Sequence, residues 1–418
     1  MAPSTKVFSL EGKGLKLDTA EDLESHIKAL REMNDVEEVR ILGNTLGVGA
    51  CKLLGEVLST KKTLRIANFA DIFTGRLLNE IPEALSSLLT SILNLPKLNT
   101  IDLSDNAFGI NTHAPLVAFL AAHIPLQHLY LNNNGLGPHC GILIANSLSE
   151  LHKKKEEARK GGQEVPDLET VICGRNRLEN GSMVAWARAY RLHNKVKLVK
   201  MVQNGIRPEG ICHLLTSGLN KATGLEVVNL QDNTFTLSGA KALAKAIPGW
   251  KNLKELGVGD CLLTGKGGVL LSAALAKGSN KKLEILRLQY NDITVAGVKS
   301  LSEAASDSLP ALKRLELNGN KFAEQDPAIL ALGELLDERK EKLGGDIVQE
   351  DDWGLDELDE LDDESDEEEE EEEEEGLEPE ELAERLLKEA EEAMEEPTVQ
   401  LKDKDVDKLA ETLEKTSI

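Results

Sequence analysis

The sequence has 418 residues, of which 41% are hydrophobic but only 3% aromatic, so any core must be packed mainly with aliphatic side chains. Its five cysteines form no CxxC pair, which argues against a zinc or disulfide framework and for buried, reduced thiols. No stretch approaches the roughly 20 apolar residues of a membrane span, and the first residues lack the apolar run of a signal peptide. We therefore expect a soluble, cytoplasmic protein.

The net charge of -25 is unevenly distributed along the chain. Residues 344–418 hold 35 acidic and 6 basic residues, whereas residues 1–343 hold 38 acidic and 42 basic ones. The first part is thus close to neutral, and the acidic tail would repel phosphates. Free nucleic acid is excluded as a partner on this ground, because phosphate binding needs clustered lysine and arginine.

A unit of about 28 residues repeats through residues 1–343, after a short apolar segment at Val7 that we expect to be a capping strand. Most copies read apolar-x-x-apolar-x-apolar-x-x-Asn and are followed by a helical apolar stripe; Ile72 and Cys261 replace the asparagine in two of them. One such strand and helix cannot bury its apolar edge alone, but stacked copies can. The pattern predicts an α/β leucine-rich-repeat solenoid, a horseshoe like that of ribonuclease inhibitor with a parallel sheet on its concave face. The copies end at Asn44, Ile72, Asn106, Asn134, Asn176, Asn204, Asn233, Cys261, Asn291 and Asn320.

The repeat needs one asparagine where the chain leaves each strand, because its amide can satisfy the backbone groups of the turn. The copy LYLNNNGLG instead contains three in a row. Asn134 lies on the repeat spacing and is predicted to be structural. Asn132 and Asn133 occupy the two preceding positions, and we expect them to point toward the concave face or its rim, where they are free for a partner.

Two copies are longer than the others. After Ile72 the sequence FTGRLLNEIPEAL adds about six residues and is expected to place Phe73 to Arg76 on the rim, either as a tolerated insertion or as a binding loop. Between Asn134 and Asn176, residues 151–166 add about fourteen polar residues, which we predict to be a solvated loop.

The acidic tail divides into two segments. Residues 344–376, which include nine consecutive glutamates from Glu367 to Glu375, are predicted to be disordered by self-repulsion. Residues 377–418 are charged but contain an apolar stripe, which indicates either a marginal helix or a helix that docks on a partner. The leucine-rich-repeat domain with its N-terminal cap is predicted to span residues 1–343.

The sequence contains no pattern typical of a catalytic or cofactor site. HExxH, GxSxG and GxxxxGK[ST] are absent, and GLGPHCG at Gly135 has the wrong spacing for a dinucleotide loop. His113, His123 and His128 are near one another in the sequence, but no carboxylate or cysteine spacing makes them a metal set. The chain is therefore predicted to be a binding surface rather than an enzyme, with no metal and no cofactor of its own.

Several strings extend well beyond the repeat consensus: DIFTGR, EIPEAL, LSDNAFG, HLYLNNNGLGP, ICGRNRLENGSM, MVQNGIRPEG and NLQDNTFT. Together they resemble the Ran GTPase-activating proteins, over roughly residues 5 to 345 and the acidic segment that follows. The resemblance is to the fungal members, since the long C-terminal domain of the animal proteins and the N-terminal targeting domain of the plant proteins are not seen.

The resemblance implies an activator of GTP hydrolysis on GTP-bound Ran in nucleocytoplasmic transport, acting as a monomer and with or without a Ran-binding protein. Ran would supply the nucleotide, magnesium and a water-positioning glutamine. It further implies that Asn133 holds this glutamine and that Arg76 stays outside the nucleotide site, although the sequence alone does not separate that role from an arginine finger. The residues expected to bind the partner are Thr74, Arg76, Asp105, Asn132, Arg175, Gln203 and Asp232.

A second hypothesis keeps the horseshoe but assigns the function to the tail. An acidic leucine-rich protein could act as a histone-type chaperone or as another protein-binding scaffold. The length of the repeats and the two longer copies argue against this alternative, because a chaperone that acts through charge needs neither.

Overall fold

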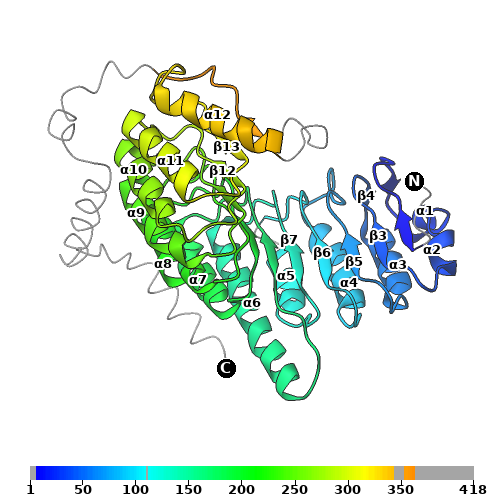
Figure 1. Cartoon of the computed structure of the whole chain (residues 1–418). Coiled ribbons are helices and arrows are strands. Elements are labelled where there is room, and N and C mark those ends of the chain that lie inside the picture. Colours follow the sequence, from blue (N-terminus) through cyan, green and yellow to red (C-terminus); the bar gives the residue numbers. More distant parts are fainter. Residues whose placement is uncertain (1–5, 110–111, 343–352, 363–418) are drawn as a thin grey trace.

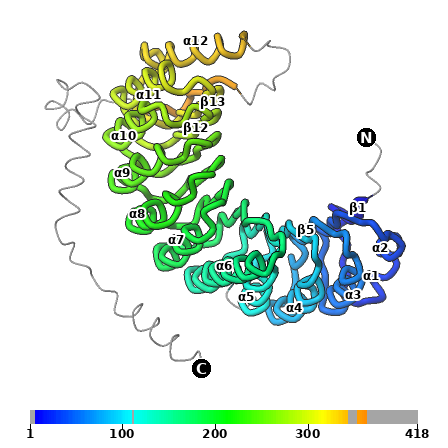
Figure 2. The backbone as a smooth tube through the Cα atoms, turned by 60° about the horizontal axis from the view of Figure 1, so that its bottom comes forward, coloured from blue at the N-terminus to red at the C-terminus, as the bar shows by residue number. Residues whose placement is uncertain are grey.

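The computed structural model describes residues 6–109, 112–342 and 353–362. Within these residues, twelve short parallel strands form one sheet in the order β1-β3-β5-β6-β7-β8-β9-β10-β11-β12-β13-β14. The strands follow the inner side of a curved solenoid, and the helices follow its outer side (Figure 1, Figure 2). This arrangement confirms the predicted leucine-rich-repeat horseshoe.

The strands are only two or three residues long, as expected where each repeat contributes one strand to a continuous sheet. The main sheet consists of β1 Val7–Ser9, β3 Glu38–Arg40, β5 Ile66–Asn68, β6 Thr100–Asp102, β7 His128–Tyr130, β8 Thr170–Ile172, β9 Leu198–Lys200, β10 Val227–Asn229, β11 Glu255–Gly257, β12 Ile285–Arg287, β13 Arg314–Glu316 and β14 Gly354–Leu355. A second sheet pairs β2 Lys16–Leu17 with β4 Thr45–Leu46. β1 pairs with β3, so the capping strand at Val7 is confirmed.

The helices stack side by side on the convex side, and from α3 to α12 each packs against the helices of the neighbouring repeats. They are α1 Ala20–Glu24, α2 Lys28–Glu32, α3 Val48–Ser59, α4 Ile81–Ile92, α5 His113–Leu120, α6 Gly137–Lys160, α7 Met183–Leu192, α8 Pro208–Ser217, α9 Thr236–Ala246, α10 Thr264–Ala276, α11 Val295–Asp307 and α12 Pro327–Lys342. A short 3-10 helix at Asn180–Ser182 precedes α7, and two others follow α8 and α9 at Leu219–Lys221 and Ile247–Gly249.

The central residue of each full repeat strand is completely buried between sheet and helices, as Leu129 in β7 and Val171 in β8 illustrate. The periodic apolar positions of the sequence are therefore the core. Four of the five cysteines are buried as well, and burial raises the pKa of Cys173 and Cys261 to about 12. These thiols are protonated side chains of the core.

A ladder of buried asparagines runs along the carboxyl ends of the strands. The Oδ1 atom of Asn134 accepts the backbone N–H of Asn106 at 2.9 Å, and Asn176 accepts that of Asn134 at 3.0 Å. The pattern continues through Asn204 and Asn233. The ladder assignment made from the repeat spacing is thus confirmed.

The predicted loop at residues 151–166 is wrong for its first part. Helix α6 continues to Lys160 and projects beyond its neighbours (Figure 1). The run of lysine, glutamate and alanine favours helix, and Lys155 anchors it by donating to the carbonyls of Ile124, Leu126 and Pro166, each at 2.7 Å. Burial lowers the pKa of this lysine to about 7. Only the residues after Gly161 form the loop.

The predicted disordered segment is also wrong in part, because residues 353–362 belong to the repeat domain. β14 adds to the edge of the sheet beside β13, with Gly354 N donating to Lys313 O at 2.8 Å. The carboxylate of Asp356 accepts the backbone N–H groups of Leu317 and Asn318 at 2.7 and 3.0 Å. Asp356 follows β14 and lies beside Glu316 rather than at the ladder position of Asn320, and its carboxylate takes the place of an acceptor that a further repeat would supply, so the acidic sequence closes the end of the solenoid. The remaining tail predictions, for residues 344–352 and from residue 363 onward, lie outside the described residues.

Candidate functional site

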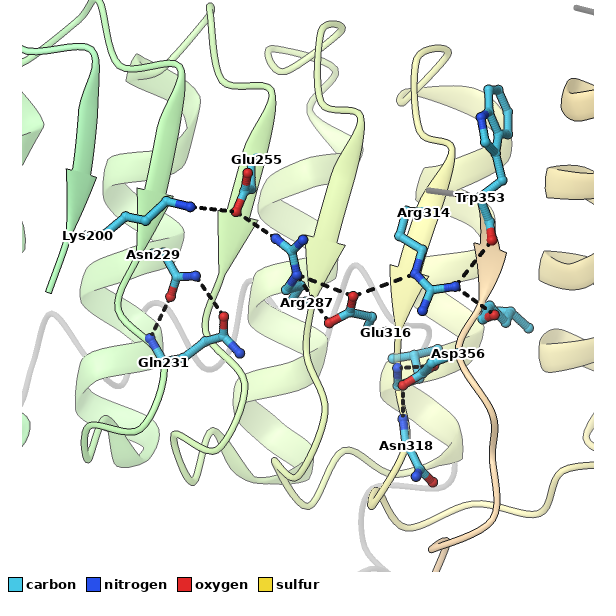
Figure 3. A network of polar contacts seen from close by, with 12 residues as sticks. Lys200, Asn229, Gln231, Glu255, Arg287, Arg314, Glu316, Asn318, Trp353 and Asp356 are labelled. Atoms are coloured by element: carbon cyan, nitrogen blue, oxygen red, sulfur yellow. Dashed lines mark hydrogen bonds and ion pairs between the residues drawn. The ribbon is translucent and has the colours of Figure 1, made fainter. Parts of the chain in front are cut away.

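Charged side chains on the concave face of the last repeats neutralise one another (Figure 3). Glu255 lies 3.6 Å from Lys200 and 2.6 Å from Arg287, and Glu316 continues the chain to Arg287 and Arg314. Arg314 also donates to two carbonyls of the β14 segment. The charges on this part of the face are already paired with one another, so we looked on the rim for side chains that could bind a partner.

The rim at the carboxyl ends of the strands carries a regular row of side chains, which we name the rim row. Its members precede the ladder position in ten successive repeats, and every one has a positive φ: Gly43, Asp71, Asp105, Asn133, Arg175, Gln203, Asp232, Asp260, Tyr290 and Gly319. Parallel strands in register bring these residues to the same edge of the sheet. Four of the residues predicted to bind a partner (Asp105, Arg175, Gln203 and Asp232) and the predicted catalytic Asn133 belong to this one row.

The left-handed turn explains only part of the row's composition. Glycine, at Gly43 and Gly319, adopts positive φ without strain, and aspartate and asparagine tolerate it better than other residues. Arg175, Gln203 and Tyr290 have φ values of 55, 54 and 54 degrees without that preference. The fold therefore does not dictate these side chains, and they remain candidates for binding.

The three consecutive asparagines have three different environments. Asn134 is 1% exposed and belongs to the ladder. Asn132 is half-buried, and its Oδ1 accepts the N–H of Gly174 at 2.6 Å, across the join to the next repeat. The prediction that Asn132 is free was wrong, because the longer repeat that follows uses its side chain. Asn133 is exposed, as predicted.

The side chain of Asn133 has one contact within the described residues. Its Nδ2 donates to Oδ1 of Asp105 in the preceding repeat at 2.9 Å. Its backbone N–H donates to Gly174 O at 2.9 Å, which fixes the turn. The amide is thus presented on the rim by a rigid backbone and keeps hydrogen-bonding capacity for a partner.

Farther along the rim row, Gln203 and Asp232 border a cavity of about 400 Å³ that Asp260 and Arg177 also line. Burial raises the pKa of the Asp232 carboxyl, and the neighbouring carboxylate of Asp260 adds to this, whereas a hydrogen bond from Gln203 opposes it. Arg175 is exposed on the same rim. The cavity edge is therefore acidic.

The loop after Ile72 is held against the N-terminal cap by Arg76. Its Nε donates to Oγ1 of Thr45 at 2.8 Å, its Nη2 donates to Thr45 O at 2.8 Å, and its Nη1 forms an ion pair with Asp18. The side chain of Arg76 is only 8% exposed. Arg76 therefore lies on the rim but does not extend into solvent.

Other residues of this loop differ in exposure. Thr74 is exposed and donates to Asp71. Phe73 was expected on the rim but is buried, with its ring 6.2 Å from that of Phe108. The sequence analysis missed Leu77 and Leu78, which are 65% and 63% exposed. Their exposure could have been predicted from the sequence, because neither leucine fits the apolar spacing of the following helix.

The described residues contain no group of three histidine, cysteine, aspartate or glutamate side chains that could hold a metal ion. Over the same part of the chain, no helix is long and apolar enough to cross a membrane. His123 lies in the core, where both ring nitrogens contact backbone carbonyls and burial lowers its pKa. The chemistry available at the rim is hydrogen bonding and charge.

Comparison with known proteins supports one family. The model described as "Leucine Rich repeat" matches residues 222–244 and 279–302. The chain is 38% identical over 341 residues to the "Ran GTPase-activating protein 1" of Saccharomyces cerevisiae, which covers 80% of this chain and 83% of that protein. It is 42% identical over 202 residues to the protein of the same name from Xenopus laevis, covering 48% of this chain and 34% of that one. Among solved structures, an internalin from Listeria monocytogenes aligns at 16% identity with a TM-score of 0.35, covering 76% of this chain and 86% of that one.

Proposed function

The chain belongs to the family of Ran GTPase-activating proteins, and we propose that it stimulates GTP hydrolysis by Ran by holding the GTPase's own catalytic glutamine with Asn133. In this proposal the chain has no catalytic centre of its own. The GTPase binds GTP and magnesium, and the activator needs no cofactor. The observation that supports the assignment is the exposed amide of Asn133 on a rigid turn, directly beside a ladder asparagine that is fully used by the fold.

The chemistry required of Asn133 is positioning. A small GTPase hydrolyses GTP slowly by itself, and its glutamine must orient the attacking water toward the γ-phosphate. An asparagine amide has both donor and acceptor atoms and can therefore hold a glutamine carboxamide in one orientation. Because the backbone of Asn133 is fixed by the turn, little entropy is lost when this contact forms.

Arg76 has a different role in this proposal. An arginine finger must reach the transferring phosphate of the partner. The guanidinium of Arg76 already donates to Thr45 and pairs with Asp18, and it is nearly buried. Reaching a nucleotide would require these contacts to break. We therefore assign Arg76 to holding the rim loop in place.

The partner surface extends from this loop along the rim row. Leu77, Leu78 and Thr74 offer an exposed, partly apolar contact at one end. Arg175, Gln203 and Asp232 offer polar contacts at the other. Asn133 lies between these two groups, so a GTPase that spans both would have its nucleotide site near the middle of its footprint.

A single-turnover assay tests the proposal. Ran loaded with GTP is mixed with increasing concentrations of the activator, and phosphate release is followed until the rate saturates. Asn133→Ala should lower the saturated rate by about 10², the scale for removing one positioning group. Arg76→Ala should raise the concentration needed for half-saturation but leave most of the saturated rate.

Two further variants control this experiment. Asn133→Gly removes the amide without strain at positive φ, as Gly43 and Gly319 show at the same repeat position. Asp260→Gly changes an exposed residue of the rim row in a distant repeat and should leave the saturated rate unchanged. A normal rate for both Asn133 variants would contradict the proposal. A loss of about 10³ at saturation in Arg76→Ala would instead identify that residue as the finger.

We also propose the setting in which this activity operates. The activator acts in the cytoplasm, as a monomer, on the GTP-bound form of Ran, because only that form has a γ-phosphate to release. Its role is in nucleocytoplasmic transport, alone or together with a Ran-binding protein. Gel filtration with light scattering and fractionation of cells expressing the tagged chain would test the monomer and its location.

A further inference from the structure

The contact between Asp105 and Asn133 joins two neighbouring members of the rim row. Asp105 follows β6 and Asn133 follows β7, and these strands pair in register. Oδ1 of Asp105 lies 2.9 Å from Nδ2 of Asn133. Both residues have left-handed backbones, with φ of 62 and 53 degrees. Their turns are fixed further, because Asp105 N donates to Asn132 O and Asn133 N donates to Gly174 O, each at 2.9 Å.

The chemistry of this pair sets the orientation of the amide. An ionised carboxylate can only accept hydrogen bonds, so the atom of Asn133 that faces Asp105 must be the nitrogen. The amide oxygen must then face away from Asp105. Within the described part of the chain, the structure gives this oxygen no partner. A hydrogen-bond donor on an approaching protein would therefore find the amide oxygen of Asn133 held in one orientation.

We propose that Asp105 is a positioning residue that selects this orientation of Asn133, so that the activator presents an acceptor oxygen to the side-chain NH2 of the partner's glutamine. This inference rests on the function proposed above for Asn133. Once the glutamine nitrogen donates to Asn133, the glutamine oxygen is the atom left to accept a proton of the attacking water. Without Asp105 the amide can turn over and present its nitrogen, which would hold the glutamine the wrong way round.

The other acidic residues of the rim row form no hydrogen bond with Asn133 within the described residues. Asp260 precedes Tyr290 in the next repeat, which has no amide to orient. Asp232 accepts a hydrogen bond from the amide of Gln203, which lies two repeats beyond Asn133, so it can orient only that other amide. Asp105 is therefore expected to act through Asn133 rather than through charge in general.

The experiment is a double-mutant cycle in the single-turnover assay. Asp105→Gly removes the carboxylate without straining the left-handed turn. It should lower the saturated rate about tenfold, roughly the value of one hydrogen bond to a charged group, while the half-saturating concentration changes little. Asp105→Asn keeps an acceptor oxygen and should give an intermediate rate. In an Asn133→Gly background, Asp105→Gly should cause no further loss.

Three results would overturn the inference. One is a saturated rate for Asp105→Gly equal to that of the unchanged chain. Another is an equal loss on Asp105→Gly in the Asn133→Gly background, which would show a direct contact of Asp105 with the partner. The third is a rate for Asp105→Asn below that of Asp105→Gly. Failure of the unchanged chain to stimulate Ran would refute the proposed function instead, so the two failures are distinguishable.

A measurement on the activator alone tests the geometry without the GTPase. The side-chain NH2 signals of Asn133 in a nitrogen–proton correlation spectrum should shift on Asp105→Gly, because the hydrogen bond to the carboxylate is lost. Asp260→Gly should leave them in place. Unshifted Asn133 signals in Asp105→Gly would show that the pair does not form in solution and would also overturn the inference.

Discussion

The structure gives the ladder asparagine Asn134 a measurable role in stability, and Asn134→Ala tests it. Nδ2 of Asn134 donates to the carbonyls of Leu103 and Leu131, each at 3.0 Å, and to Asn132 O at 3.1 Å. Its Oδ1 accepts the backbone N–H of Asn106 at 2.9 Å. The substitution removes all four hydrogen bonds at a site that is 1% exposed.

The four losses do not cost the same. Leu103 O still receives Nδ2 of Asn106, and Leu131 O still receives Nδ2 of Asn176. The backbone N–H of Asn106, in contrast, has no other acceptor within the described residues and stays buried. An orphaned buried donor costs about 1 to 3 kcal/mol. Adding the loss of the amide's packing, we expect the free energy of unfolding to fall by about 2 to 3 kcal/mol.

Urea unfolding of the full chain, followed by circular dichroism, measures this change. Asn133→Gly is the matched control, because it alters the neighbouring exposed amide and should change the free energy of unfolding by less than about 1 kcal/mol. If Asn134→Ala unfolded at the same urea concentration as the unchanged chain, or if Asn133→Gly were destabilised as much, the separation of structural and functional asparagines would be refuted.

Three further predictions concern other parts of the domain. Cys261→Asn should raise the free energy of unfolding by about 1 kcal/mol, because an amide forms stronger hydrogen bonds at the ladder position than a thiol. The Sγ atom of Cys261 lies 3.5 Å from Leu230 O and 3.3 Å from Gly259 O. An unchanged free energy of unfolding in urea would contradict this prediction. A chain ending at residue 342 should melt a few degrees below one ending at residue 362, since it lacks the contacts of Asp356. Equal melting temperatures in calorimetry would show that residues 353–362 do not stabilise the end of the solenoid. Burial lowers the pKa of His193 to about 4, so the unfolded chain binds the proton first and stability should fall between about pH 6.5 and 4. His193→Gln should flatten that part of the pH profile, and an unchanged slope would show that other groups control it.

The regular features of the fold were predictable from the sequence because each repeat solves the same packing problem. The asparagine spacing identified the ladder. Asn134 lies on that spacing and Asn133 does not, which was enough to predict that Asn134 is structural and Asn133 is not part of the ladder. The strand register then followed, since stacked copies place equivalent residues beside each other. The position of the candidate site on the rim is a direct consequence of this register.

The errors occurred where a contact depends on another repeat. The side chain of Asn132 accepts a hydrogen bond from the backbone N–H of Gly174, which lies 42 residues later in the sequence. Phe73 is buried because Phe108, in the next repeat, covers it. Lys155 keeps α6 helical through carbonyls that lie 11 to 31 residues away. None of these partners can be identified from local pattern or charge.

The acidic segment shows the same limit at the level of composition. Residues 353–362 carry the charge pattern of a disordered chain, yet Leu355, Leu358 and Leu361 pack against the core. Their spacing of three residues was visible, but the exposed edge of β13 that they cover was not. A carboxylate is favoured there because Asp356 accepts two backbone N–H groups that the last repeat leaves unpaired.

The rim row connects the fold to the proposed function. The ladder residue fixes the turn, so the residue before it has a rigid backbone and, where it is not glycine, an exposed or half-buried side chain whose identity the core does not constrain. Glycine occupies this position at Gly43 and Gly319, near the two ends, and polar or charged side chains fill most of the row between them. Among these, the amide of Asn133 donates to the carboxylate of Asp105, and its oxygen has no hydrogen-bond partner within the described residues. A repeat fold can therefore present a side chain on a rigid backbone outside any pocket, and the proposed mechanism requires no more of this chain if the partner brings the nucleotide, the metal and the water.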